Sequence, residues 1–92
     1  GDRWELLSPA AETLGERHPL AATLLRRALI EATLTRKRTT RYGHAARHWR
    51  ACAELAGRIG DFERFERHDD FRRRIEATHG RKLGFWARVA ER

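Results

Sequence analysis

Residues 18–59 constrain the fold of this chain more than any other stretch. They read HPLAATLLRRALIEATLTRKRTTRYGHAARHWRACAELAGRI, which is two strongly helical runs joined by a short basic connector. From Pro19 to about Lys37 there is no helix breaker, and good helix formers dominate. A second run extends from about Arg41 to Arg58, with Thr39 or Thr40 expected to cap its start. The pattern predicts a central antiparallel helical hairpin over 18–59.

The two predicted helices differ in how their apolar residues are distributed. The first is apolar on nearly all sides, which is typical of a central helix packed by several neighbours. Its broad apolar face comprises Ala21, Leu24, Leu25, Ala28, Leu29 and Ala32, with Leu20, Ile30 and Leu34 on the opposite side. The second has one apolar arc, made of Tyr42, Ala45, Ala46, Trp49, Cys52, Ala53, Ala56 and Ile59. Because Arg27 and Glu31 are four residues apart on the first helix, their charges can pair, although an exposed pair would add only ~0.3–0.5 kcal/mol.

Residues 1–17 precede the hairpin as a lead-in segment. Ser8-Pro9 is a good helix start, since a hydroxyl can cap the helix and proline suits its first position. We expect a short helix from Pro9 to about Glu16, with Trp4 packed on the hairpin.

Residues 60–92 complete the predicted domain with a loop and two helices. The loop covers 60–68, and the acidic first turn at Asp69 and Asp70 favours a helix that starts at His68. A last helix is expected from Leu83 to Arg92. The apolar anchors are Phe62 and Phe65 in the loop, Phe71 and Ile75 in the first helix, and Phe85, Trp86 and Val89 in the last. No segment alternates as a strand does, so the predicted fold is all-α, with four to five helices.

Size and composition set further bounds. The chain has 92 residues, 36% charged and 40% hydrophobic, which suits one small domain over 1–92. It contains no apolar run near the roughly 18 residues that a membrane span requires. The single cysteine, Cys52, excludes an internal disulfide framework and favours a reducing, cytoplasmic location. Because the chain starts at Gly1 and contains no Met, we expect it to be a fragment of a longer protein.

The net charge of +7 is concentrated in residues 36–50, which hold six cations and no acidic residue. Such a window could bind phosphates or an acidic protein surface. Tyr42 and Trp49 lie nearby and could stack on bases, but Trp49 is also the centre of the apolar arc. A solvated connector without a partner remains an alternative. The candidate contact residues are Arg36, Lys37, Arg38, Arg41, Arg47 and Arg50.

Metal binding has one candidate constellation, His44, His48 and Cys52, spaced four residues apart on one helix. That spacing places two nitrogens and one sulfur in line. Cys52 falls in the apolar arc, however, and no second ligand pair such as CxxC is present. The sequence therefore predicts no metal and no other cofactor.

Catalysis has weak candidates only. A mid-helix thiol in an apolar setting is inert, so Cys52 is not expected to act as a nucleophile. No glycine-rich loop is present to hold a phosphate of a nucleotide. His79-Gly80-Arg81-Lys82 could form an anion site before the last helix, although a helix stop followed by an aromatic anchor at Phe85-Trp86 explains it better. The prediction is that this chain is not an enzyme.

Three blocks of the sequence, HPLAATLLRRALI, RYGHAARHWRACAELA and HGRKLGFW, carry a resemblance to a known family. They resemble, in the same order, the C-terminal region of a family of uncharacterised bacterial proteins built from helical repeats. The similarity covers roughly His18 to Trp86. It implies the capping end of an α-solenoid and supplies no catalytic residues. No regular tetratricopeptide period is present, so the class of repeat stays open.

The sequence therefore predicts a non-catalytic helical module for protein–protein interaction or scaffolding. Its basic connector would meet an acidic protein partner or the remainder of the parent chain. A nucleic-acid-binding module that places the same arginines on phosphates is the alternative. No membrane association is expected.

Overall fold

The computed structural model describes residues 4–91, with side chains from Pro9 onward, as a bundle of five α-helices. These are α1 (Trp4–Arg17), α2 (Pro19–Thr35), α3 (Tyr42–Ala56), α4 (His68–His79) and α5 (Leu83–Ala90), with a short 3₁₀ turn, η1 (Thr39–Arg41), before α3. The described residues contain no strand, so the predicted all-α fold is confirmed.

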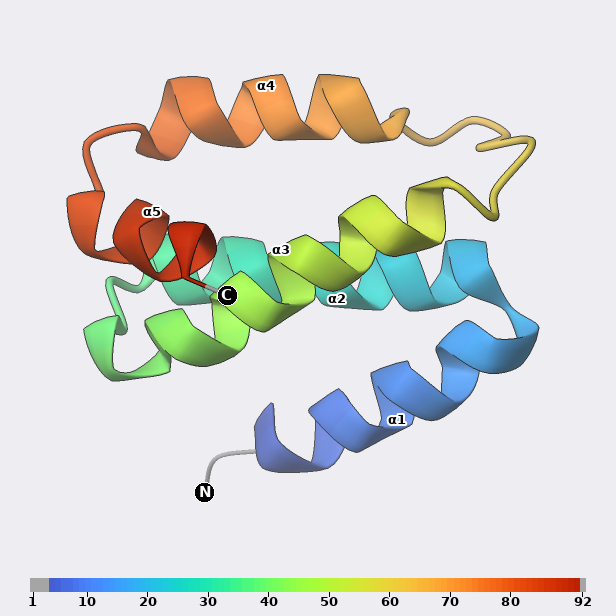
Figure 1. Ribbon diagram of the computed structural model, residues 1–92, viewed down its shortest axis with the longest axis horizontal. Helices are drawn as coiled ribbons and strands as arrows, with labels where there is room; N and C mark the ends of the chain where they lie inside the picture. The colour runs from blue at the N-terminus through green and yellow to red at the C-terminus, as the bar shows by residue number, and fades with distance from the viewer. Residues whose placement is uncertain (1–3, 92) are drawn as a thin grey trace.

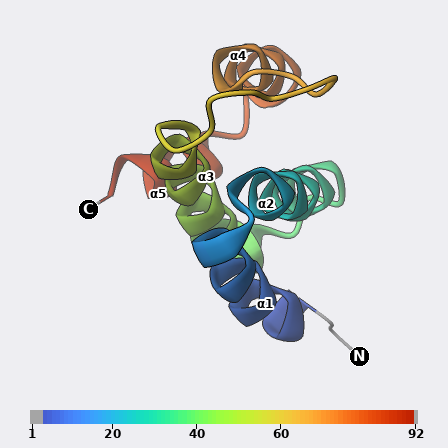
Figure 2. The same cartoon turned by 90° about the vertical axis from the view of Figure 1, so that its right-hand side faces the viewer.

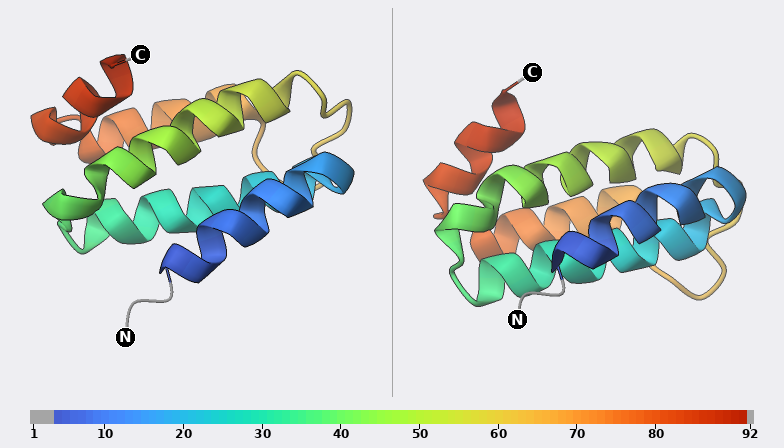
Figure 3. Two further views of the ribbon diagram at one scale, coloured as in Figure 1. Left: turned by 60° about the horizontal axis from the view of Figure 1, so that its bottom comes forward. Right: turned by 90° about the horizontal axis from the view of Figure 1, so that it is seen from below.

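Helices α2 and α3 run antiparallel as the predicted hairpin, and the other helices are arranged around them (Figure 1). Viewed from one end, α2 and α3 lie side by side, with α1 below them and α4 above (Figure 2). Helix α5 crosses α3 steeply, near the N-terminal end of α3 (Figure 3). The connections of α2 to α3 and of α4 to α5 both lie at the left end of Figure 1.

The core is an aromatic cluster where α3, α4 and α5 meet. Trp49 packs edge-on against Phe85 and against Trp86, with ring centroids 5.9 and 5.1 Å apart. Phe71 of α4 reaches the same indole at 5.9 Å, which holds α4 over the hairpin. The predicted anchors of α3, α4 and α5 are therefore confirmed. The buried members of the cluster are Ile30, Leu34, Tyr42, Ala45, Ala46, Trp49, Cys52, Phe71, Ile75 and Phe85.

The predicted broad apolar face of α2 is only partly buried. Its Leu29 is buried, but Ala21 and Ala28 are exposed, and Leu24, Leu25 and Ala32 are half-buried. Ile30 and Leu34, predicted on the opposite side, are buried as well, together with residues that were not predicted inside: Ala22, Thr23, Arg26, Arg27 and Thr33. The cause is that arginine stems are long and apolar, so two arginines can lie inside the bundle where hydropathy alone places them outside.

Two predicted local features also differ from the structure. Helix α1 starts at Trp4, so Pro9 lies inside it and not at its start. The predicted packing of Trp4 and the capping by Ser8 concern side chains outside the described residues. Neither Thr39 nor Thr40 caps α3 with its side chain, because η1 intervenes and the residue at the helix boundary is Arg41.

The predicted Arg27–Glu31 pair does not form, because each residue has a different partner. Glu31 pairs with Arg74 of α4, with 2.6 Å between Oε1 and Nη2. Arg74 also binds the carboxylate of Glu66, and this hydrogen bond lowers the pKa of Glu66. Arg27 donates instead to the backbone oxygen of Glu66 at 2.9 Å. These contacts tie α4 and the loop before it to α2.

Helix α2 ends in a Schellman motif with an unusual residue at its key position. The Arg38 N–H donates to the Thr33 oxygen and the Lys37 N–H to the Leu34 oxygen, the two bonds that define the motif. Lys37 occupies the left-handed region, with φ of 55°. Glycine is favoured there because a side chain strains this conformation. The chain therefore carries a cation where the backbone would prefer no side chain.

Candidate functional site: a basic end of the bundle

The turn between α2 and η1 presents three cations to solvent. Arg36, Lys37 and Arg38, hereafter the basic turn, are all exposed. Within the described part of the chain, no side-chain hydrogen bond or ion pair engages any of them. Their backbone is nevertheless fixed by the Schellman motif and by a hydrogen bond from the Thr39 N–H to the Lys37 oxygen. The basic turn is thus an ordered projection of positive charge.

A second pair of cations lies at the same end of the molecule. Arg81 is exposed and Lys82 half-buried, in the connection between α4 and α5. Figures 1 and 3 both place this connection at the end of the bundle that carries the basic turn. The two segments lie more than forty residues apart in sequence, and the fold brings their charge to one end.

Two of the three remaining cations of the 36–50 window, Arg47 and Arg50, line a hollow between α3 and α5. This α3–α5 pocket has a volume of about 350 Å³ and is lined by Thr40, Gly43, His44, Arg47, Arg50, Arg88 and Glu91. Arg47 and Arg50 were predicted as contact residues, whereas Arg88 was not. Arg41, the last predicted contact, is half-buried in η1.

Arg50 also fastens the end of α5. Its Nη1 donates to the backbone oxygens of Arg88 and Val89, at 3.1 and 3.5 Å. A cation at the C-terminal end of a helix satisfies free carbonyls and suits the helix dipole. Arg50 therefore has a structural role that the count of charges in its window does not reveal.

The aromatic residues near the basic window are not available for stacking on bases. Trp49 and Tyr42 are each only 8% exposed, and both belong to the core cluster. The Tyr42 ring packs edge-on against Phe85 with centroids 5.9 Å apart. The alternative that Trp49 serves as a buried anchor is the one that holds.

Residues 1–88 match the model of a protein family described as a family of unknown function, DUF6880. The chain belongs to this family. No curated protein and no solved structure matches it.

The metal candidates of the DUF6880 domain lie in different environments. His44 is exposed, whereas His48 and Cys52 are buried among core residues. No three His, Cys, Asp or Glu side chains in the described ranges are grouped so that they could hold a metal ion. Burial raises the pKa of the Cys52 thiol to about 11, so this thiol stays protonated.

His48 has a role inside the hairpin. Its Nδ1 lies 2.8 Å from Nη1 of Arg26, and a guanidinium can only donate, so Nδ1 accepts this hydrogen bond. Burial, with Arg26 and Arg47 nearby, lowers the pKa of His48 to about 4. The imidazole is therefore neutral at pH 7 and links α2 to α3.

The segment His79-Gly80-Arg81-Lys82 serves as a helix stop and docking point. The Trp86 indole N–H donates to the His79 backbone oxygen at 2.9 Å, which anchors α5 against the end of α4. The alternative favoured from the sequence, an aromatic anchor after a helix stop, matches this contact.

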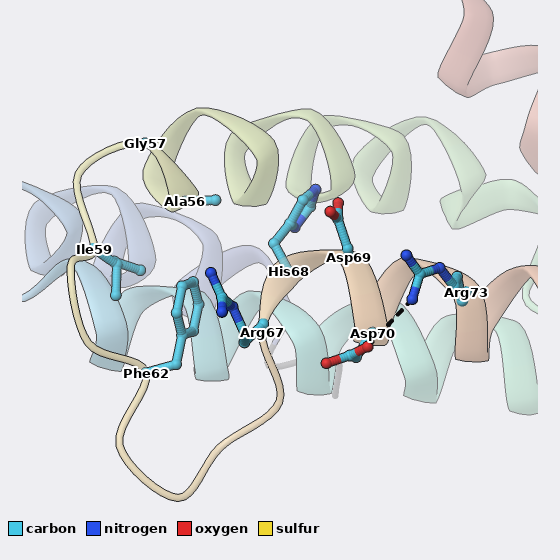
Figure 4. A pocket seen from close by; sticks show the side chains of 9 residues that line it. All are labelled: Ala56, Gly57, Ile59, Phe62, Arg67, His68, Asp69, Asp70 and Arg73. Carbon is cyan, nitrogen blue, oxygen red and sulfur yellow. Dashed lines mark hydrogen bonds and ion pairs between the residues drawn. The ribbon is translucent and has the colours of Figure 1, made fainter.

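A larger hollow, of about 490 Å³, lies between the end of α3 and the start of α4 (Figure 4). In Figure 4, His68 and Asp69 point toward α3, while Asp70 points away and pairs with Arg73 at 3.4 Å. Its lining also includes Arg67, so its two acidic and two basic residues balance in charge. The basic end of the bundle, which comprises the basic turn with Arg81 and Lys82, has an excess of positive charge and is the stronger candidate for a binding site.

The helices offer no membrane-spanning segment. Among residues 4–91, none is both long enough and apolar enough to cross a bilayer.

Proposed function

We propose that this DUF6880 domain is a non-catalytic interaction module that docks on an acidic protein surface through its basic end. The observation that carries the proposal is the basic turn, where Arg36, Lys37 and Arg38 are exposed and no described side chain engages them. Charge complementarity of this kind steers association and fixes which partner binds. Arg81 and Lys82, in the connection of α4 to α5 at the same end of the bundle (Figure 1), add two further cations.

The strain at Lys37 supports a role for the basic turn in binding. A residue with a side chain in the left-handed region destabilises the fold by about 1 kcal/mol relative to glycine. Strained backbone tends to occur where function requires a particular side chain. At Lys37, the strained position carries an exposed cation in place of the glycine that the backbone conformation favours.

Nucleic acid is the alternative partner, and the aromatic residues argue against its single-stranded form. Proteins that bind single strands without sequence preference stack bases on exposed aromatic rings. Tyr42 and Trp49 are buried here. A duplex bound through phosphates alone would still use the basic turn, and the test below separates the two partners.

The proposal includes a place for the domain in a larger cytoplasmic protein of bacterial origin, as the capping end of a helical array. Support comes from α1, α2 and α3, which stack in alternating directions as the helices of such arrays do (Figure 1). The buried, reduced thiol of Cys52 fits a reducing compartment. Small-angle scattering of the parent chain should then give an elongated profile, and a compact spherical one would contradict it.

The test is fluorescence anisotropy of three labelled ligands, a polyglutamate peptide, mixed-sequence duplex DNA and mixed-sequence RNA, at ~50 to ~200 mM salt. The variant replaces Arg36, Lys37 and Arg38 with Gln. A matched control replaces Arg17, Arg64 and Arg67 with Gln, which removes the same charge from exposed positions at the opposite end. We expect polyglutamate to bind the wild type more tightly than either nucleic acid.

The variants give distinct outcomes. The basic-turn variant should weaken polyglutamate binding at least ~10-fold, and the control less than ~3-fold. Equal losses in both variants would show that only net charge matters, which would overturn the proposal. Tighter binding of DNA or RNA than of polyglutamate would replace the protein partner with a nucleic acid.

A further inference from the structure

The α3–α5 pocket gathers three guanidinium groups, those of Arg47, Arg50 and Arg88, from two helices into one hollow. We propose that this pocket binds a phosphate monoester, carried by a side chain of the acidic protein partner. The inference rests on the proposed docking function and adds to it a specific chemical group and the residues that receive it.

The three guanidinium groups are held in position before any ligand arrives. Arg50 donates to the carbonyls at the end of α5, and Arg47 hydrogen-bonds His44 through Nη2. Arg88 pairs through Nε with Glu91 at 3.2 Å. A side chain that is already ordered loses less entropy when it binds. The pocket differs in this respect from the basic turn, where the side chains have no such contacts.

Gly43 makes the position of Arg88 possible. Gly43 lies in the first turn of α3, and a Cβ atom there would be 2.5 Å from Nη2 of Arg88. The Arg88 guanidinium therefore lies directly against the backbone of α3. Glycine within a helix destabilises it by about 1 kcal/mol relative to alanine. The close approach of Arg88 explains why a glycine occupies this position despite that cost.

Hydrogen-bond donors remain available at each arginine. A guanidinium has five N–H groups. In contacts with residues 4–91, each arginine engages one of its nitrogen atoms: Nη2 of Arg47, Nη1 of Arg50 and Nε of Arg88. Thr40, whose side chain carries a hydroxyl donor, lines the same hollow.

The charge of the pocket matches a dianion better than a single carboxylate. Among the described residues, its lining has three arginines against one acidic residue, Glu91. A phosphate monoester carries about −1.5 to −2 charges at pH 7 and has three strong acceptor oxygens. A tetrahedral group can accept from donors in several directions, whereas a planar carboxylate accepts mainly from one guanidinium fork. Arginines arranged on two helices suit the tetrahedral group.

Inorganic phosphate is the probe for this inference, with acetate as the planar competitor. Backbone amide shifts are followed by NMR on the 92-residue chain while each anion is added at constant ionic strength. We expect phosphate to shift the amides of Thr40, Gly43 and His44 to saturation, with a Kd on the order of 1 mM. Acetate should bind at least ~10-fold more weakly.

Two variants and one matched control locate the site. Arg88→Gln should weaken phosphate binding at least ~10-fold, whereas Arg64→Gln, which removes the same charge from an exposed position at the opposite end of the bundle, should change it less than ~2-fold. Gly43→Ala keeps every charge and displaces only the end of the Arg88 side chain, so it should weaken binding ~3-fold or more. Equal effects of Arg88→Gln and Arg64→Gln, or no effect of Gly43→Ala, would overturn the inference.

Failure of this inference can be told apart from failure of the docking function. If phosphate does not saturate but the basic-turn variant still loses polyglutamate binding, the docking function stands and the phosphate site is wrong. If phosphate binds in the pocket and polyglutamate binds nowhere, the anion site stands without the acidic partner. A phosphorylated peptide that binds no better than its unphosphorylated form would also overturn the inference.

Discussion

The interior of the α2–α3 hairpin and the turn that closes it contain the same type of cation in opposite environments. Inside, Arg26 and Arg27 are only 8% and 6% exposed. Ten residues further along the same hairpin, Arg36 is exposed, and no described side chain binds it. The difference separates cations that take part in folding from cations left for a partner. The net charge of a window does not make this distinction.

The interior cations are accommodated by rings and carbonyls more than by acids. The Arg27 guanidinium lies over the ring of Phe71 at 4.7 Å and that of Phe62 at 5.7 Å. Burial lowers the pKa of Arg27, and its Nε and Nη2 have no hydrogen-bond partner within the described residues. Cation–π contacts and long apolar stems offset part of the cost of burial. At the turn, by contrast, no such cost arises.

The largest predicted effect lies in the hairpin interior. Trp49→Ala should reduce the free energy of unfolding by ~3–5 kcal/mol, because Trp49 contacts Phe71, Phe85 and Trp86 and its removal leaves a cavity. Urea denaturation followed by circular dichroism measures the change. An unchanged midpoint would show that the aromatic cluster does not organise the core.

The second prediction concerns pH and the interior histidine. The pKa of His48 is lowered to about 4 by burial, whereas an unfolded histidine titrates near 6.5. The unfolded state therefore binds more protons between these values, so stability is full above pH 6.5 and falls as pH decreases toward 4. The loss attributable to this group is roughly 3 kcal/mol.

The control for this pH dependence is His48→Gln, since burial lowers the pKa of His68 and His79 as well. Unfolding free energies at pH 7, 5.5 and 4.5 give the slope for each protein. The wild type should lose more stability than His48→Gln over this range. Parallel curves would mean that His48 is protonated in the folded hairpin.

The smallest predicted effect lies at the turn and has the opposite sign. Lys37→Gly should stabilise the domain by up to ~1 kcal/mol, because glycine adopts the left-handed conformation of Lys37 without strain. The same substitution should weaken polyglutamate binding. Thermal denaturation measures the first effect and anisotropy the second. Destabilisation by Lys37→Gly would show that the lysine side chain supports the turn.

The parts of the fold that could be predicted are those set by periodicity and local signals. The spacing of Phe71 and Ile75 and the aromatic residues of α5 each identify a buried face without knowledge of the neighbours. The predicted arc of α3 does so in large part, although its Ala53 is exposed and Leu55, outside the arc, is buried. The face of α2 could not be predicted in this way, since Arg26 and Arg27 are inside because of His48, Phe62 and Phe71, which come from other segments. Tertiary partners decided the orientation of that helix.

In the candidate site, too, features that are local in sequence could be predicted and those that depend on distant segments could not. The basic turn is contiguous in sequence, so its three cations were visible in the charge pattern, and their role as contact residues stays a prediction. The α3–α5 pocket depends on Arg88, which lies far from Arg50 in sequence and carries no motif of its own. The one local signal was Gly43, a poor helix former near the start of a helix, which indicates a close neighbour without naming it.

The attachment of α5 has a consequence for when the pocket exists. Helix α5 has eight residues, too few to be stable as an isolated helix. Its order depends on Trp86 bound to the end of α4 and on Arg50 of α3. A chain in which α4 has come loose loses the support of α5, and with it one wall of the pocket, while the α2–α3 hairpin and its basic turn persist. A partner that must bind both the basic turn and the α3–α5 pocket therefore binds only molecules whose folding is complete.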